Sequence, residues 1–238
     1  MKLIDRDLYL RQLIDVYGTP DIKVITGVRR SGKSKLMEAF HDYLANEYKD
    51  VNIIHINLIM PENENLKEYH ALYNYVNEKY IPGRENVLLI DEVQMCEGFE
   101  KAIIGFHTSE KYDIYITGSN AFLLSSDLAT LFTGRTFRIE VYPFSFKEFC
   151  KYYDLTDVQA ALDRYLLEGG MAGSYVYKNE AGKDKYLKDI YNTLIMRDIV
   201  QKFSIRKPVL IEKVSDFLMD NISNITSARS ITASVLNG

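Results

Sequence analysis

The sequence predicts an α/β fold with three layers, in which helices cover both faces of a parallel sheet of about five strands. Two observations predict it. Up to Pro143, short apolar segments of strand length alternate with segments of helical periodicity. One segment, residues 87–90 (VLLI), is apolar at every position, which is typical of a strand buried on both faces of a parallel sheet. After Pro143 the strand signals stop, and the remaining chain predicts helices.

The expected elements follow one another in regular order. Strands are expected at residues 21–26, 51–58, 87–90, 112–117 and 136–142. Helices are expected between them, where apolar residues recur at helical spacing, at residues 35–48, 66–80, 99–108 and 121–131. Further helices are expected at residues 145–153, 158–167, 184–203 and 208–222. A parallel strand order of this kind requires crossover helices, which the alternation supplies.

The composition is that of an ordinary globular protein. The chain has 238 residues, is 47% hydrophobic and carries a formal net charge of -4, which gives no general attraction to nucleic acid. Cys96 and Cys150 are far apart and form no metal-ligand pattern with the 4 histidines, so we expect reduced structural thiols. The N-terminus is charged throughout, and no apolar run approaches the ~20 residues that span a bilayer. We therefore expect a cytoplasmic protein with no membrane partner.

The end of the first expected strand carries a phosphate-binding motif. Residues 27–34 match the pattern GxxxxGK(S/T) in full, between an expected strand and an expected helix. Gly27 and Gly32 let the backbone curl so that successive N–H groups point at phosphate oxygens. Lys33 is expected to reach the β- and γ-phosphates, and Ser34 to offer its hydroxyl to Mg²⁺. The motif predicts that ATP is bound together with Mg²⁺ by a P-loop NTPase core.

The remaining residues of the motif complete the expected nucleotide site. Val28, Arg29, Arg30 and Ser31 form the rest of the loop. The helix from Lys35 onward points the positive end of its dipole at the same phosphates. Arg29 and Arg30 either contact phosphate or a partner subunit, or are merely solvated, and the sequence leaves both interpretations open.

A pair of acids follows the third expected strand. Asp91 and Glu92 come directly after the apolar residues 87–90. In P-loop enzymes an aspartate at such a strand end helps to hold Mg²⁺, so Asp91 and Ser34 are the expected metal ligands. Glu92 is the expected general base, because a carboxylate beside the metal can polarise the attacking water.

Two later segments add candidate catalytic residues. The fourth expected strand leads into Ser119 and Asn120, and ligands bind at the carboxyl ends of parallel strands. If this strand lies between the strand of the P-loop and that of Asp91, Ser119 or Asn120 can hydrogen-bond the γ-phosphate or the water. Otherwise they are turn residues. Arg135, just before the fifth strand, either stabilises the transferring phosphoryl group, in its own chain or in a neighbour, or forms a surface salt bridge.

These motifs predict Mg²⁺-dependent binding and hydrolysis of ATP. The alternative is a regulatory switch, in which ATP occupancy with little turnover controls DNA or protein binding. A GTPase is disfavoured because no guanine-reading Asn/Thr-Lys-x-Asp motif follows Glu92. A small-molecule kinase is disfavoured because the adjacent Asp91 and Glu92 fit hydrolysis better.

The order of these motifs resembles that of the P-loop ATPases with an additional strand and a catalytic glutamate. More closely, it resembles the AAA-like (AAA_14) prokaryotic ATPases that carry a C-terminal DUF4143 region and are related to the archaeal ATPase and STAND groups. The resemblance covers about residues 1–205. The matching positions are Arg6, Leu10 and Leu13, and residues 25–34, 89–94, 117–120, 131–136 and 142–149.

The resemblance implies a domain organisation and a partner. It implies an ATPase core at residues 1–143, a small helical lid at residues 144–206 and the beginning of a truncated winged-helix-like domain at residues 207–238. It also strengthens Arg135 as a catalytic candidate. We expect the recognition helix, and with it a DNA or protein partner, to require residues beyond Gly238. The sequence leaves the oligomeric state open.

Overall fold

The structure is a computed structural model that describes residues 4–118, 132, 134–201 and 203–237. The chain divides into two compact units, Met1–Lys183 and Asp184–Gly238. The first unit contains the sheet, its covering helices and two further helices, and the described residues of the second unit form helices and their connections. The limits expected for core, lid and winged-helix-like domain stay predictions.

Five parallel strands form the sheet in the described part of the first unit, as the sequence predicts. They are β1 (Ile22–Thr26), β2 (Asn52–Asn57), β3 (Asn86–Asp91), β4 (Asp113–Thr117) and β5 (Thr136–Glu140). Their order in the sheet is β2-β3-β4-β1-β5, and every neighbouring pair is parallel. β4 therefore lies between β1 and β3, and the carboxyl ends of all these strands meet at one edge.

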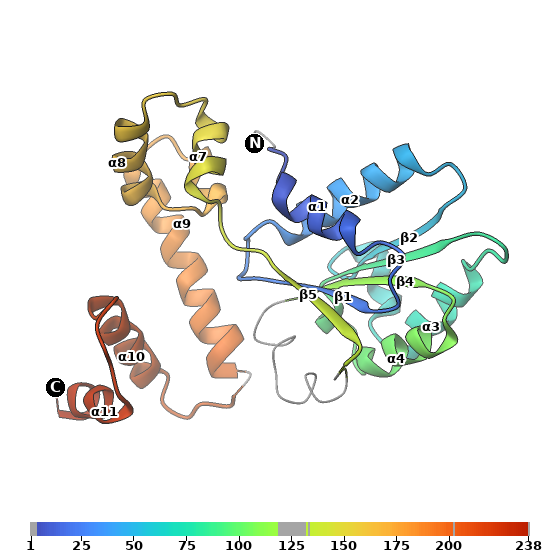
Figure 1. The fold of residues 1–238 in the computed structure, drawn as a ribbon. Helices are drawn as coiled ribbons and strands as arrows, with labels where there is room; N and C mark the ends of the chain where they lie inside the picture. The colour runs from blue at the N-terminus through green and yellow to red at the C-terminus, as the bar shows by residue number, and fades with distance from the viewer. Residues whose placement is uncertain (1–3, 119–131, 133, 202, 238) are drawn as a thin grey trace. The chain divides into compact units, whose positions relative to one another are not determined.

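Helices cover both faces of the sheet and make the three expected layers (Figure 1). One face carries α1 (Asp7–Asp15) and α2 (Lys33–Glu47), and the other carries α3 (Tyr69–Glu78) and α4 (Phe99–Ser109). Alternate residues of β1 serve the two layers, because Val24 packs with the core of α3 and α4, whereas Ile25 packs with that of α1 and α2. β3 is buried at all 6 positions, which confirms the prediction for this strand.

Between β2 and β3 the helix is shorter than its periodicity predicts. A 3₁₀ helix, η1 (Pro61–Leu66), comes first, and α3 begins only at Tyr69. The reason is a cap: the Glu68 carboxylate accepts hydrogen bonds from the backbone N–H groups of His70 and Ala71, at 2.9 and 3.3 Å. A 3₁₀ turn, η2 (Val93–Met95), follows β3. The helix expected at residues 121–131 lies outside the described residues.

Two helices follow the sheet in the first unit, close to their expected limits. They are α7 (Phe146–Tyr153) and α8 (Val158–Glu168), and the 3₁₀ helix η3 (Ala172–Val176) packs with them. Their core is aromatic: the ring centroid of Phe149 lies 5.2 Å from that of Tyr165 and 5.5 Å from that of Tyr175. A capping box formed by Ser145 and Glu148 starts α7.

The second unit consists of helices in its described residues. α9 (Glu180–Thr193) leads into it and continues as the π-helical segment η4 (Leu194–Gln201), where the sequence predicts a single helix. α10 (Pro208–Asp220) begins at a proline, which suits the first turn of a helix, and packs against α11 (Ala228–Asn237). Within the described residues, no helix combines the length and the apolar character needed to cross a membrane.

Candidate functional site

The loop at residues 27–34, called the P-loop below, joins β1 to α2. Gly27 has a φ of +150°, and a Cβ at this position would lie 2.2 Å from the carbonyl oxygen of Val141. Gly32 forms the N-cap of α2 with a φ of +99°. No residue with a side chain fits at Gly27, and one at Gly32 would be strained. The structure thus explains both glycines of the motif.

Lys33 and Ser31 point to a loop that receives an anion. Lys33 is only 4% exposed, and its Nζ donates hydrogen bonds to the carbonyl oxygens of Gly27 at 3.0 Å and Val28 at 3.1 Å. A phosphate would offer this ammonium group charged acceptors, which form stronger hydrogen bonds than neutral carbonyls do. The buried hydroxyl of Ser31 has no hydrogen-bond partner among the described residues. An ordered phosphate would supply acceptors that this part of the loop lacks.

At the end of β3, neighbouring strands hold Asp91 from both sides. Asp91 is 1% exposed. Its Oδ1 accepts a hydrogen bond from the hydroxyl of Thr117, the last residue of β4. Its Oδ2 accepts one from Nδ2 of Asn57, the last residue of β2, at 3.0 Å. Each carboxylate oxygen has roughly two acceptor sites, so both oxygens keep capacity for a metal ion or a metal-bound water.

Glu92 follows in a strained backbone conformation. Its φ of 57° and ψ of 49° are left-handed, which costs a non-glycine residue roughly 1–2 kcal/mol. Its backbone N–H donates to Oγ1 of Thr117 at 3.0 Å, and its carboxylate accepts a hydrogen bond from Nε2 of Gln94. Strain that the surroundings hold in place is common at functional sites. The Thr117 hydroxyl therefore ties Asp91 and Glu92 together.

The P-loop and the two acids lie on either side of the end of β4. Ile25 of β1 pairs with Thr117 of β4, and Ile90 of β3 pairs with Ile116 of β4. Neighbouring strands are ~4.8 Å apart, so β1 and β3 are separated by roughly 10 Å at this edge. β4 thus lies between the strand of the P-loop and that of Asp91, which is the condition under which residues at its end can contact a nucleotide.

Arg135 lies at the opposite edge of the sheet. It precedes β5, whose first residue, Thr136, pairs with Ile22 at the start of β1, and its own carbonyl oxygen accepts a hydrogen bond from the N–H of Ile22 at 2.8 Å. β1 has 5 residues. A strand of that length spans about 16 Å, more than an arginine side chain can reach. The structure does not bring Arg135 to the P-loop of its own chain.

The remaining expected residues lie in and around the P-loop. Half-buried side chains are those of Val28, Arg29 and Ser34, and exposed ones are those of Arg30 and Lys35. Lys35 forms an ion pair with Glu38 on the surface of α2, so a contact of its side chain with a nucleotide would require that pair to open, whereas its backbone N–H is not involved in the pair. Ser119 and Asn120 lie outside the described residues.

Two side chains of the site, Thr117 and Asn57, were not among the expected site residues. Both are the last residue of an apolar strand, and Asn57 pairs with Asp91 in the register of β2 and β3. The signal that could have found them is a polar residue closing a strand next to that of Asp91. Using it requires the strand order, which the sequence does not state.

The donor set fits Mg²⁺ better than it fits a metal held by protein ligands alone. Within residues 4–118, 132, 134–201 and 203–237, no group of three or more His, Cys, Asp and Glu side chains could hold a metal ion. Mg²⁺ bound with a nucleotide needs only one or two protein oxygens, since phosphates and water supply the rest. The hydroxyl of Ser34 and the carboxylate of Asp91 are oxygen donors of the kind it prefers.

Two family models match this chain. The model AAA_14, described as an AAA domain, matches residues 19–150, which is more than half of the chain. A second model, DUF8612, a domain of unknown function, matches residues 159–236. The resemblance was to ATPases that carry a C-terminal DUF4143 region, and the model that matches here is a different one.

Similar proteins cover nearly all of this chain. An uncharacterized protein of Haemophilus influenzae is 35% identical over 235 residues, which are 97% of this chain and 59% of that protein. The uncharacterized protein MJ1544 of Methanocaldococcus jannaschii is 30% identical over 97% of this chain and 52% of its own length. The chain thus spans little more than half of each relative. The solved Walker-type ATPase PABY2304 of Pyrococcus abyssi aligns with 99% of this chain and 88% of its own, at a TM-score of 0.52 and 17% identity.

Proposed function

Because the chain belongs to the AAA_14 family of AAA domains, we propose that it binds ATP with Mg²⁺ at the P-loop and hydrolyses it. The family and the parallel sheet make it an AAA-like protein with a P-loop ATPase fold. One observation carries the proposal: β4 lies between β1 and β3, so the P-loop and the pair Asp91 and Glu92 flank a single strand end. Binding and water activation can then act on one phosphate chain.

The P-loop holds the phosphates in this proposal. Backbone N–H groups of residues 27–35 would point at the phosphate oxygens, except that of Ser31, which donates to the carbonyl oxygen of Val28 at 3.2 Å, and the N-terminus of α2 adds its positive dipole end. Lys33 exchanges the carbonyl oxygens of Gly27 and Val28 for those of the β- and γ-phosphates. Its burial supports this role, because an ammonium group with 4% exposure gains little competing hydration.

Ser34 and Asp91 hold the metal ion. Mg²⁺, when bound, neutralises charge on the β- and γ-phosphates. Asp91 contributes an oriented carboxylate, because Thr117 and Asn57 each hold one of its oxygens. Such partners of a metal-binding carboxylate fix its direction before the metal arrives.

Glu92 is the proposed general base. It is only half-buried, so a water molecule can reach it, and its hydrogen bond from Gln94 orients the carboxylate. Ser119 or Asn120 would contact the γ-phosphate or this water from the end of β4. Because Arg135 lies at the far edge of the sheet, its proposed role is to stabilise the transferring phosphoryl group from a neighbouring chain.

The attached C-terminal part is proposed to read out the nucleotide state. Residues 207–238 would form the beginning of a winged-helix-like domain. Together with further residues, this domain would bind DNA or a protein partner in the cytoplasm. A relation to the STAND group belongs to the same proposal. The alternative is a switch that binds ATP with little turnover, and the geometry of the P-loop favours neither hydrolysis nor the switch.

Phosphate release from ATP tests the proposal. The comparison is between the wild type and Lys33→Ala, with and without Mg²⁺, and Lys49→Ala, at an exposed lysine just after α2, serves as the matched control. We expect Mg²⁺-dependent release that falls by about a hundredfold or more in Lys33→Ala, since a group contacting the transferring phosphate is lost. Release that Lys33→Ala retains would refute the site. Binding of ATP without release would favour the switch.

A further inference from the structure

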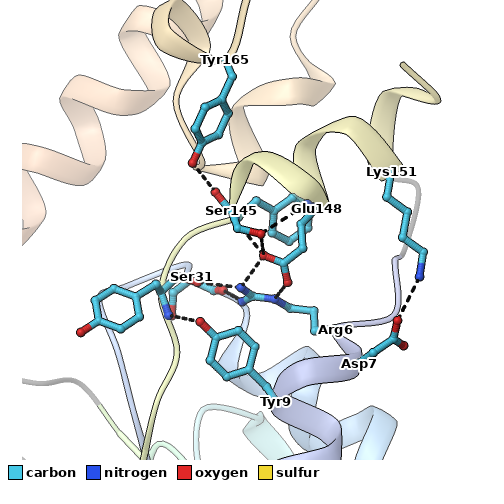
Figure 2. Close-up of polar contacts among 10 residues, drawn as sticks. Arg6, Asp7, Tyr9, Ser31, Ser145, Glu148, Lys151 and Tyr165 are labelled. Carbon is cyan, nitrogen blue, oxygen red and sulfur yellow. Dashed lines mark hydrogen bonds and ion pairs between the residues drawn. The ribbon is translucent and has the colours of Figure 1, made fainter. Parts of the chain in front are cut away.

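Arg6 is a buried arginine at the start of α1 that contacts the P-loop and two neighbouring positions much later in the chain (Figure 2). Its Nη1 donates a hydrogen bond to the carbonyl oxygen of Ser31 in the P-loop, at 2.7 Å. Its Nη2 donates to the carbonyl oxygen of Tyr142 beyond β5, at 2.9 Å. Its Nε donates to Oε1 of Glu148 in α7, at 2.8 Å. A single planar group thus joins the P-loop to the beginning of α7.

The guanidinium group is held rigidly in this position. The ring centroids of Tyr9 and Phe144 lie 4.5 and 5.3 Å from its central carbon. A second hydrogen bond to Glu148, from Nη2 to Oε2 at 3.2 Å, makes the ion pair bidentate. Bidentate pairs fix geometry as well as charge. Arg6 is 8% exposed, so little room is left for a different rotamer.

The contact with Ser31 determines how the next amide of the P-loop points. A trans peptide unit is planar, so its carbonyl oxygen and its N–H point in opposite directions. When Arg6 holds the oxygen of Ser31, the N–H of Gly32 must point away from Arg6. Gly32 and Lys33 open α2, and N–H groups at this position are those that bind phosphate at a helix N-terminus.

We propose that Arg6 is a positioning residue that presets the Ser31–Gly32 peptide, so that the Gly32 N–H faces the phosphates. The proposal rests on the proposed ATP site and extends it to a side chain 25 residues before Ser31. Arg6 acts in this role through the Ser31 carbonyl and not through a substrate atom, and four of its five N–H groups donate to Ser31, Tyr142 and Glu148. An arginine is required, since only a planar fork can serve these acceptors at once.

Glu148 offsets the free-energy cost of burying the charged guanidinium group of Arg6. Its carboxylate balances the charge of Arg6 and also accepts a hydrogen bond from the backbone N–H of Ser145 at 2.8 Å, as part of the capping box. Tyr165 of α8 supports the same segment, because its hydroxyl donates to the carbonyl oxygen of Phe144 at 2.7 Å. The partly buried ion pair of Arg6 and Glu148 therefore connects the P-loop to the first turn of α7.

The test compares Arg6→Lys with Arg11→Lys, the same substitution at an exposed position of α1. Lysine keeps the charge but cannot reach Ser31, Tyr142 and Glu148 together. We expect Arg6→Lys to weaken binding of a fluorescent ATP analogue with Mg²⁺ by about tenfold, the equivalent of about 1.4 kcal/mol. KM for ATP should rise by a similar factor and kcat should change little, as for lost ground-state binding. Arg11→Lys should match the wild type.

Hydrogen exchange gives a readout that needs neither nucleotide nor activity. In the nucleotide-free protein, peptides covering residues 31–36 should exchange faster in Arg6→Lys than in Arg11→Lys. If Arg6→Lys does not fold, Glu148→Gln takes its place and should show the same change to a smaller extent, because the amide holds the guanidinium group through a single oxygen.

Two results separate the proposals. Unchanged exchange over residues 31–36, together with unchanged nucleotide affinity in a folded Arg6→Lys, would overturn the role of Arg6 while leaving the ATP site intact. A wild type that binds no nucleotide would overturn the proposed function instead. In that case the exchange of residues 31–36 still decides whether Arg6 sets the loop.

Discussion

Thr117→Val removes the hydroxyl that connects the two acids of the site and keeps the shape of the side chain. Thr117 is fully buried at the end of β4. Its hydroxyl donates to Asp91 and accepts the backbone N–H of Glu92 at 3.0 Å. With valine, the N–H of Glu92 loses this acceptor. The carboxylate of Asp91 loses the hydrogen bond from Thr117 and keeps the one from Asn57.

The size of the effect follows from those two losses. A buried donor without an acceptor costs about 1–3 kcal/mol, and a hydrogen bond to a charged group contributes about 1.5–3 kcal/mol. Because one hydroxyl makes both contacts, the losses overlap, and we expect Thr117→Val to lower the free energy of unfolding by about 2–4 kcal/mol. Turnover should fall by at least about tenfold, since Asp91 and Glu92 both lose their orientation.

Urea denaturation and phosphate release measure the two effects on the same samples. Thr117→Ser is the matched control, because it keeps the hydroxyl and loses one buried methyl group, which costs about 1 kcal/mol. We expect Thr117→Ser to keep most of the activity. If Thr117→Val is as stable and as active as Thr117→Ser, the hydroxyl does not organise the site and the reasoning is refuted.

Three further predictions concern groups outside the reacting centre. Burial alone would raise the pKa of Glu148, but hydrogen bonds from Arg6 and the Ser145 backbone hold it below its usual value. The stability that the ionised Glu148 contributes should therefore be lost as the pH falls below about 4.3. In acid denaturation, the stability of Glu148→Gln should depend less on pH than that of the wild type, and equal curves for the two proteins would contradict the assignment. Burial raises the pKa of the Cys96 thiol to about 12. Iodoacetamide at pH 8 should therefore label Cys150 and spare Cys96 in the native protein, and equal labelling of both by mass spectrometry would contradict this. Lys23→Met removes the ion-pair partner of Asp113 at the edge opposite the P-loop, where Asp113 keeps hydrogen bonds from Gly18 and Tyr115. It should lower the free energy of unfolding in urea by about 3 kcal/mol without changing KM for ATP, whereas a raised KM would show that the two edges are coupled.

The strands could be predicted because they depend on local patterns, whereas their order in the sheet is known only from the structure. The apolar run before Asp91 and the glycine motif after β1 both mark strand ends, and the structure places these ends within about a residue of the expected ones. The helix expected at residue 66 begins at Tyr69, because the side chain of Glu68 caps it. A glutamate as N-cap is not the usual signal, which is serine, threonine, aspartate or asparagine.

The contacts that organise the site could not be predicted, because they join residues far apart in the chain. Thr117 and Asp91 are 26 positions apart, and they meet only because β4 lies beside β3. Arg6 and Glu148 are 142 positions apart. The position of Arg135 could not be predicted either, because the sequence around it does not show that it lies at the edge of the sheet opposite the P-loop.

Glu92→Gln tests the central claim most directly, because it changes one oxygen of the proposed general base to an amide nitrogen and leaves the P-loop untouched. Glu97→Gln, an exposed glutamate shortly after β3, is the control. The account predicts that Glu92→Gln binds ATP with Mg²⁺ about as well as the wild type and releases phosphate at least about a hundredfold more slowly. Phosphate release by Glu92→Gln at the rate of the wild type would contradict it.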